Sequence, residues 1–176
     1  MFKKFIIVIL GVMCVTMVKP VKKASANNSK FITIETSQGN VIIEMLPKIA
    51  PNHVKRIREL VKKDFYDGII FHRVIAGCMA QTGDPDGNGT GGSGKNLKAE
   101  FSDYEYKYST VGMARSMNPD SGDSQFFICF DGCSHLTGQY TVWGQVVSGM
   151  EAVEKLAVGE PPRSPDKMIS VRLGKK

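Results

Sequence analysis

Apolar and polar residues alternate from residue 31 to residue 46, a pattern typical of strands that are buried on one face. Ile32 and Ile34 alternate with Thr33 and Glu35, and successive side chains of an extended chain point to opposite faces. The alternation is interrupted by Ser-Gln-Gly-Asn, a tetrapeptide with strong turn preferences. The pattern therefore predicts two strands around a turn.

The apolar spacing changes to that of a helix after Pro51. Val54, Ile57, Leu60 and Val61 form a stripe at helical spacing. Proline suits a first helical position, where its missing amide hydrogen leaves no bond unmade. The lysines and arginines of this segment lie mostly outside the stripe, as expected for a solvated helix face.

A second, shorter helix is predicted in the segment SGMEAVEKLAVG near the C-terminus. Ser148 and Glu151 have the spacing of a capping box, in which each side chain bonds a backbone amide of the first turn. Met150, Val153 and Leu156 would form the side of this helix that faces the core.

The rest of the chain contains further strand patterns separated by turns. The runs GIIFHRVI, STVGMAR, SQFFICF, YTVWGQVV and MISVRLG are typical of strands, and DPDGNGTGGSG is a long glycine-rich loop. Many short strands with two helices favour a closed or nearly closed β structure with helices packed on it. A length of 176 residues suits one domain.

The first 26 residues have the features of a secretory signal. Two lysines precede the apolar block FIIVILGVMCVTMV, and small residues follow at Ala24 and Ala26. The block is shorter than the roughly 20 apolar residues that span a bilayer. Three lysines between the block and the cleavage site are unusual, so an uncleaved N-terminal anchor is the alternative. We therefore assign residues 1–26 to a signal peptide and residues 27–176 to one exported domain, periplasmic or secreted and bacterial.

The leader also accounts for most of the net charge. Five of the 23 basic residues lie in it and none of the 17 acidic residues does, which leaves 18 basic against 17 acidic residues. Such a balance gives no reason to expect nucleic-acid binding. The only membrane contact expected is through an uncleaved leader.

Arg73 stands out because it interrupts an apolar strand. A buried guanidinium without a partner is very costly, so it is either a structural ion pair or faces a ligand. Alternation places Arg73 and Ile75 on one face, and an extended chain would add Met79 and Gln81 to that face. The carbonyl oxygen of Gln81 could hold the guanidinium.

A later strand repeats this arrangement, with Gln125 and Phe127 on one side. Together the two segments describe an apolar pocket with one fixed cation and two amides. His72 falls on the opposite face from Arg73, and we expect it to be a buried histidine with its hydrogen bonds satisfied.

Two weaker motifs in the glycine-rich loop suggest nucleotide binding. Gly87, Gly89 and Gly92 fit the G-x-G-x-x-G dinucleotide motif, and a near P-loop has Asn96 where a metal-binding hydroxyl belongs. Both motifs need a following helix, which the pattern does not predict. A loop that needs the conformational freedom of glycine is the simpler interpretation.

Ser124 lies in the segment SGDSQFF, which is similar to the G-D-S stretch of secreted serine proteases. A serine hydrolase is therefore a rival function, although the usual glycines after the serine are missing. The alternative role for Ser124 is that of a residue at the start of a strand.

Cys78, Cys129 and Cys133 remain outside the leader, and an odd number does not form a complete disulfide framework. One pair could still oxidise. Cys129, Cys133 and His135 are candidate zinc ligands, but a structural site usually needs four, so we expect no metal.

The motifs FHRVIAGCMAQTGD, GNGTGG, SQFFI and YTVWGQVVSGMEAVEKL together resemble the cyclophilin-type peptidyl-prolyl cis-trans isomerases. The resemblance runs from about Phe31 to Leu173, in the family's order. It implies a mainly β fold, a closed eight-stranded antiparallel barrel capped by two α-helices. It also implies an enzyme without cofactor that rotates X-Pro bonds in proline-containing polypeptides and assists the folding of exported proteins. A proline-peptide-binding module or chaperone with little turnover is the alternative.

The resemblance also assigns the site residues, through the motif positions that match the family's own. The catalytic positions are Arg73, Gln81 and Phe127. The substrate-binding positions are Met79, Ala114, Arg115, Ser116, Gln125, His135, Leu136 and Tyr140.

Four positions depart from the family's common pattern. Cys78 replaces an aromatic residue, Arg115 an asparagine and Tyr140 a histidine. His135 stands where cyclosporin-sensitive members carry tryptophan, and the loss of the indole donor implies weak cyclosporin binding. Nothing in the sequence demands more than a monomer.

Overall fold

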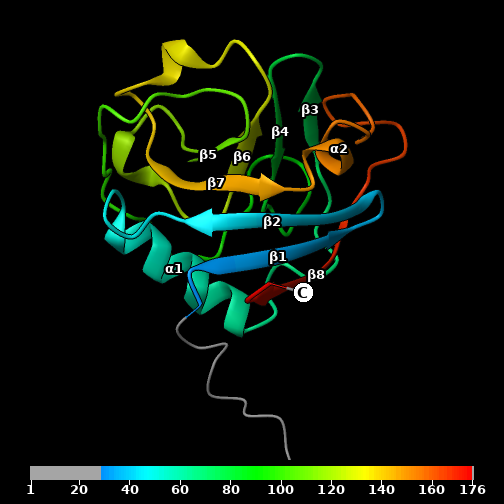
Figure 1. Ribbon diagram of the computed structural model, residues 1–176, viewed down its shortest axis with the longest axis horizontal. Coiled ribbons are helices and arrows are strands. Elements are labelled where there is room, and N and C mark those ends of the chain that lie inside the picture. The colour runs from blue at the N-terminus through cyan, green and yellow to red at the C-terminus, as the bar shows by residue number, and fades with distance from the viewer. Residues whose placement is uncertain (1–28, 176) are drawn as a thin grey trace, which may run out of the picture.

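The computed structural model describes residues 29–175, so the predicted leader and its boundary at residue 26 lie outside the described residues. Eight strands form one antiparallel sheet in the order β3-β4-β6-β5-β7-β2-β1-β8 (Figure 1). The strands are β1 (Phe31–Thr36), β2 (Gly39–Met45), β3 (Arg73–Ile75), β4 (Met79–Thr82), β5 (Thr110–Met113), β6 (Phe126–Cys129), β7 (Val142–Ser148) and β8 (Met168–Leu173). The α-helices are α1 (Pro51–Lys62) and α2 (Met150–Val153), and the 3₁₀ turns are η2 (Pro119–Ser121) and η3 (Ser134–Leu136).

The alternating pattern near the start of the chain forms the predicted hairpin. β1 pairs with β2 from Phe31 opposite Glu44 to Thr36 opposite Gly39. The other edge of β1 pairs with β8, so the two ends of the described chain are joined in the sheet. This pairing confirms the predicted hairpin, in which strand propensity and turn chemistry favour the same structure.

Helix α1 begins at Pro51, as predicted, and buries its apolar stripe against the sheet near β8. Ala50 precedes the helix and offers no side-chain cap. The carboxylate of Glu100 serves instead, because it accepts hydrogen bonds from the backbone N–H groups of Asn52 and His53, each at 3.0 Å. An acidic group is also favoured at this positive end of a helix.

The predicted capping box of α2 is wrong. The helix has only four residues, and its N-cap is Gly149 at φ +93°, with no capping side chain. A side chain at Gly149 would collide with the backbone of Asn40 in β2. The close approach to β2 therefore demands a left-handed glycine turn, and this turn takes the place of the Ser148 cap.

The expected closed barrel is not formed, because the sheet is open between β3 and β8. The segments before these two strands meet in one isolated bridge, between Ile70 and Lys167, and Phe71 N donates to Asp166 O at 2.9 Å. Gly68 N and Ile69 O also bond Met168 across this seam, but the chain runs in turns through residues 63–68 and forms no strand there. β3 is accordingly shorter than the run from Ile69 that the sequence predicted.

The two faces of the sheet carry two separate apolar clusters. In β6, Phe126 and Ile128 belong to the main core inside the half-barrel. Phe127 and Cys129, which alternate with them, belong to a second cluster on the outer face. This second cluster provides the floor of the candidate site. Within residues 29–175, no helix is long and apolar enough to cross a bilayer.

Candidate functional site

Three predicted site residues lie in one row across the sheet. Arg73 in β3 is opposite Gln81 in β4, and Gln81 is opposite Phe127 in β6. The sequence suggested a chain that stays extended past Gly77. In the structure the chain instead reverses direction there, between β3 and β4. The residues share a face because antiparallel pairing aligns them, and the same pairing places Ile75 opposite Met79.

The row opens into a hollow of about 270 Å³, which we call the apolar slot. Phe127 and Met79 form its wall and are only 5% and 6% exposed. The Phe127 ring stacks on Tyr106 and meets Tyr140 edge-on, with both pairs of ring centroids 5.8 Å apart. The slot is lined by Arg73, Ile75, Cys78, Met79, Gln81, Ala114, Arg115, Phe127, His135, Leu136 and Tyr140.

Arg73 is less buried than the sequence suggested, since 42% of its side chain is exposed. Its Nε donates to Oε2 of Glu160 at 2.7 Å. Gln81, which was expected to orient the guanidinium, instead donates from its amide nitrogen to Oε1 of Gln125 at 2.9 Å. The cation at the rim of the slot is thus held by a carboxylate.

Glu160 was not predicted from the sequence, where no motif marks it. It lies 87 residues after Arg73. Its neighbour Gly159 exchanges two backbone hydrogen bonds with Val74 of β3, each at 2.9 Å. This bridge carries Glu160 to the edge of the strand that bears Arg73.

A second hollow of about 540 Å³, the glycine-rich groove, adjoins the slot. Gln81, Ala114 and Arg115 line both hollows. Gln125 ties the glycine-rich loop to the sheet, since its amide nitrogen donates to the carbonyls of Gly89 at 3.0 Å and Gly91 at 2.8 Å. Ser116 and Gln125, both predicted to bind substrate, line the groove and not the slot.

The carboxylate of Asp84 organises the start of the same loop. It accepts hydrogen bonds from the backbone N–H groups of Asp86 at 2.8 Å, Asn88 at 3.0 Å and Gly89. Burial raises the pKa of Asp84, but the hydrogen bonds from these loop amides bring it below its ordinary value. The loop therefore folds around a fixed negative charge, and no helix follows it as a nucleotide motif requires.

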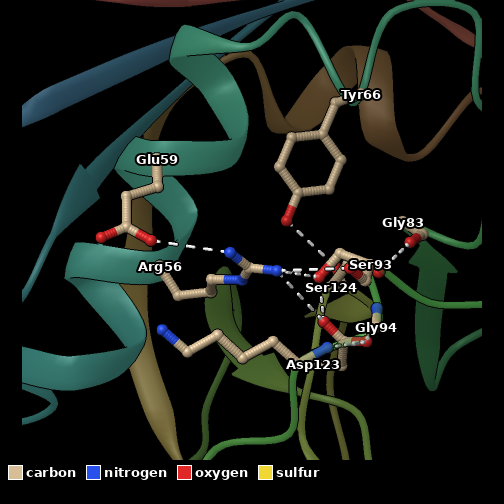
Figure 2. A network of polar contacts seen from close by, with 9 residues as sticks. Arg56, Glu59, Tyr66, Gly83, Ser93, Gly94, Asp123 and Ser124 are labelled. Atoms are coloured by element: carbon tan, nitrogen blue, oxygen red, sulfur yellow. Dashed lines mark hydrogen bonds and ion pairs between the residues drawn. The ribbon is translucent and has the colours of Figure 1, made fainter.

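A polar network fastens the far side of the loop to helix α1 (Figure 2). Nη2 of Arg56, a buried residue of the helix, donates to Oγ of Ser93 at 2.6 Å. Ser93 donates in turn to Asp123, which also accepts from the Gly94 N–H at 2.8 Å. The groove is thus fixed by hydrogen bonds along both of its sides.

Ser124 belongs to this scaffold and has no exposed hydroxyl. It is fully buried, and its Oγ donates to Gly83 O at 2.8 Å, while Tyr66 donates to its carbonyl (Figure 2). The serine hydrolase alternative has no nucleophile at this position. Ser124 is a buried structural residue, although it lies in a bend two residues before β6 and not in the strand itself.

Arg115 forms the partition between the two hollows. Its guanidinium donates to Gln139 O at 3.0 Å and lies 4.4 Å from the centre of the Tyr140 ring. The backbone of Ala114 runs beside it, with its N–H bonded to Gln125 O. These contacts place a cation over an aromatic face, a favourable arrangement.

The cysteines gather beneath the slot. Cys129 and Cys133 are buried, Cys78 lines the slot, and Sγ of Cys133 donates to Cys78 O at 3.1 Å. His135 is exposed, and its Nδ1 lies 3.1 Å from Gly132 O. Among residues 29–175 no three side chains form a metal-binding group, and all three thiols are free.

His72 differs from its prediction. It is buried, as expected, but neither ring nitrogen has a hydrogen-bond partner. Burial lowers the pKa of His72, although the nearby charge of Asp84 acts in the other direction. A neutral histidine is therefore favoured here.

Residues 31–173 match the family model described as cyclophilin type peptidyl-prolyl cis-trans isomerase/CLD. A Brucella suis protein named probable peptidyl-prolyl cis-trans isomerase is 45% identical over 167 residues, covering 85% of each chain. A peptidyl-prolyl cis-trans isomerase of Helicobacter pylori is 39% identical over 144 residues, covering 80% of this chain and 88% of the relative.

Solved structures show the same similarity. A cyclophilin from Hirschia baltica superposes with a TM-score of 0.74 at 29% identity, over 82% of this chain and 74% of the other. A cyclophilin-type isomerase of Cryptosporidium parvum, crystallised in the presence of the dipeptide Ala-Pro, superposes with a TM-score of 0.77 at 25% identity. The match covers 83% of this chain and 99% of the other.

Proposed function

The chain belongs to the cyclophilin-type peptidyl-prolyl cis-trans isomerase family, and from this premise we propose how its two hollows act on an X-Pro bond. The apolar slot takes the proline ring against Phe127, Met79 and Leu136. The glycine-rich groove and the backbone of residues 114–116 take the flanking peptide. The observation that carries this assignment is that the Arg73 guanidinium lines the same slot as Phe127 and Met79.

The reaction needs a group that prefers the twisted amide. An X-Pro bond is planar because its nitrogen lone pair is delocalised, and rotation has a barrier of about 18–20 kcal/mol. At the twisted transition state the lone pair is localised and accepts a hydrogen bond. A donor that binds this state more tightly than the planar state lowers the barrier.

The guanidinium of Arg73 is suited to this role. Arginine keeps its charge and presents rigidly oriented N–H donors. The buried wall beside it restricts the proline ring, so the rotating nitrogen is brought to the rim where the cation lies. The step requires no covalent intermediate and no proton transfer, and the side chains lining the slot are sufficient for it.

The substrate class follows from the shape and chemistry of the slot. Phe127 and Tyr140 form an aromatic corner beside the apolar side chain of Met79, which suits a proline ring. The Cryptosporidium relative crystallised in the presence of Ala-Pro supports this choice. The exposed His135 offers no indole N–H, which supports weak cyclosporin binding.

The site of action is proposed from the leader. The lysines, apolar block and small residues of residues 1–26 support export, cleaved or anchored, and a role in folding exported proteins as a monomer. Fractionation of a bacterium producing the full-length chain tests this: recovery in the cytosol only would contradict it.

Exchange spectroscopy on an X-Pro peptide tests the reaction directly. We expect the purified protein to speed cis-trans exchange, and Arg73→Ala to lower this activity by about 100-fold or more, as for loss of other transition-state donors. The matched control is Arg172→Ala, which removes a half-exposed arginine paired with Asp67 at 2.7 Å, on β8 and not in the slot.

Two outcomes would contradict the proposal. Activity of Arg73→Ala near that of the wild type would remove Arg73 from the reaction. Peptide binding without faster exchange in the wild type would favour the binding-module alternative.

A further inference from the structure

The ion pair between Arg73 and Glu160 does not have the features of a stabilising contact. The two side chains are 42% and 53% exposed, and Nε and Oε2 are 2.7 Å apart. Ion pairs in such exposed positions contribute little to folding, because water and salt screen them. We therefore expect the ion pair to act on the position of the Arg73 side chain and not on the stability of the fold.

The carboxylate of Glu160 restricts the Arg73 side chain, which the pairing of β3 in the sheet does not fix. Arg73 is the first residue of a three-residue strand at the end of the sheet. Its long side chain has four rotatable bonds, and half of it faces solvent. A partner at Nε fixes the last of these bonds and selects the rotamers that keep the guanidinium at the slot.

The way the bond is made leaves the working donors available. Glu160 engages Nε, and among residues 29–175 the terminal nitrogens Nη1 and Nη2 have no hydrogen-bond partner. These donors remain for a substrate nitrogen. A bidentate partner would have occupied one of them.

Glu160 is itself held firmly in place. The bridge between Gly159 and Val74 ties its backbone to β3 by two hydrogen bonds of 2.9 Å. Gly159 has φ +152°, and a side chain there would collide with Pro162. The carboxylate is thus presented from a backbone with a defined conformation, and not from a free loop.

We propose that Glu160 is a positioning residue, which holds the Arg73 guanidinium at the slot with its terminal donors directed to the substrate. This inference rests on the proposed role of Arg73. Glu160 does not touch the rotating bond and acts through Arg73 alone.

The test measures kcat and KM for X-Pro exchange in Glu160→Ala, Glu160→Asp and the double variant with Arg73→Ala. We expect Glu160→Ala to lower kcat about tenfold with KM within about twofold, since a misplaced group loses transition-state binding. Glu160→Asp keeps the charge and should recover part of the loss. The unfolding midpoint should stay unchanged.

The double variant gives the decisive comparison. If Glu160 acts through Arg73, adding Glu160→Ala to Arg73→Ala should cause no further loss. The matched control is Glu44→Ala, which breaks another exposed ion pair of 2.7 Å, with Lys30, away from the slot.

Several outcomes would overturn the inference. These are wild-type or higher activity in Glu160→Ala, equal losses in the presence and absence of Arg73, and a loss explained by a lower unfolding midpoint. If Arg73→Ala itself kept wild-type activity, the proposed function of Arg73 would fail first, whatever Glu160 does.

Discussion

The apolar slot and the glycine-rich groove share a wall but are built on different principles. The slot consists of side chains placed by strand register, with Phe127 and Met79 nearly buried. The groove consists of loop backbone held by hydrogen bonds to Gln125 and Asp84. Packing sets the first hollow and polar contacts set the second. In our proposal, the packed side chains of the slot act on the X-Pro bond and the hydrogen-bonded loop of the groove takes the flanking peptide.

The largest effect that separates the two hollows should come from Gly112→Ala. An added methyl group would lie 2.5 Å from Cζ of Phe127 and would also meet the Tyr106 hydroxyl. The ring would be pushed into the slot while Arg73 stays intact. We expect kcat/KM to fall about tenfold, because a displaced ring no longer fits the proline; the overpacking itself should cost about 1–3 kcal/mol of folding stability.

The matched change in the groove is Gly91→Ala. There the methyl group would meet the carboxylates of Asp84 and Asp86. It should leave exchange of a short X-Pro peptide near the wild-type rate. Equal losses in both variants on that short peptide would show that the two hollows do not work separately.

Gln125→Ala should have a smaller effect, mainly on long peptides. It removes the two hydrogen bonds that Gln125 donates to Gly89 and Gly91, each worth about 0.5–1.5 kcal/mol, and the oxygen that accepts from the Gln81 amide. We expect kcat/KM to fall about fivefold for peptides that extend into the groove and by less for short ones, which sense only the change at Gln81. Gln139→Ala, which removes an exposed amide bonded to His135 O, is the control.

A still smaller effect is expected at the rim of the slot from His135→Trp. The new indole N–H supplies one donor, and one hydrogen bond would tighten cyclosporin binding about threefold. Titration calorimetry measures the dissociation constants. An unchanged constant would show that the missing indole is not what weakens binding.

The smallest effect should be on the pH dependence of stability. It concerns His72, a buried residue that lines neither hollow. Burial lowers the pKa of His72 below the 6.5 of an unfolded histidine. Unfolding then takes up a proton just below pH 6.5, so the free energy of unfolding falls as the pH decreases there. Urea unfolding should show a flatter slope for His72→Phe between about pH 7 and about pH 5.5.

His53 provides an internal check on that slope. Burial lowers its pKa as well, despite the hydrogen bond to Glu100, so part of the slope should remain in His72→Phe. Activity per folded molecule should stay constant over the same range, since arginine does not titrate there. An activity that falls in parallel with stability would place a histidine in the reaction.

The sequence predicted the faces of the sheet better than its edges. Alternation grouped Phe127 with the pocket-lining side of its strand, where the structure puts it in the second apolar cluster, and helical spacing located α1, because burial dictates both patterns. The open seam could not be predicted in this way. It depends on how far a ladder continues between Ile70 and Lys167, which are remote in sequence.

The polar contacts of the site were the least predictable part. Arg73 was expected to be buried and bound by Gln81, and His72 was expected to be satisfied. The structure gives Arg73 a partner from a distant segment and leaves His72 without one. Local patterns tell which face a side chain is on, but not which remote backbone will bring a carboxylate to it.

The distance along the chain between Arg73 and Glu160 has a consequence for biosynthesis. During synthesis, a contact between segments 87 residues apart cannot form until the later segment has been made. Until the segment around residue 160 has been synthesised, the nascent chain has no Glu160 carboxylate to bind Arg73. Full isomerase turnover should therefore begin only near the completion of synthesis, which makes catalytic rate a reporter of finished assembly.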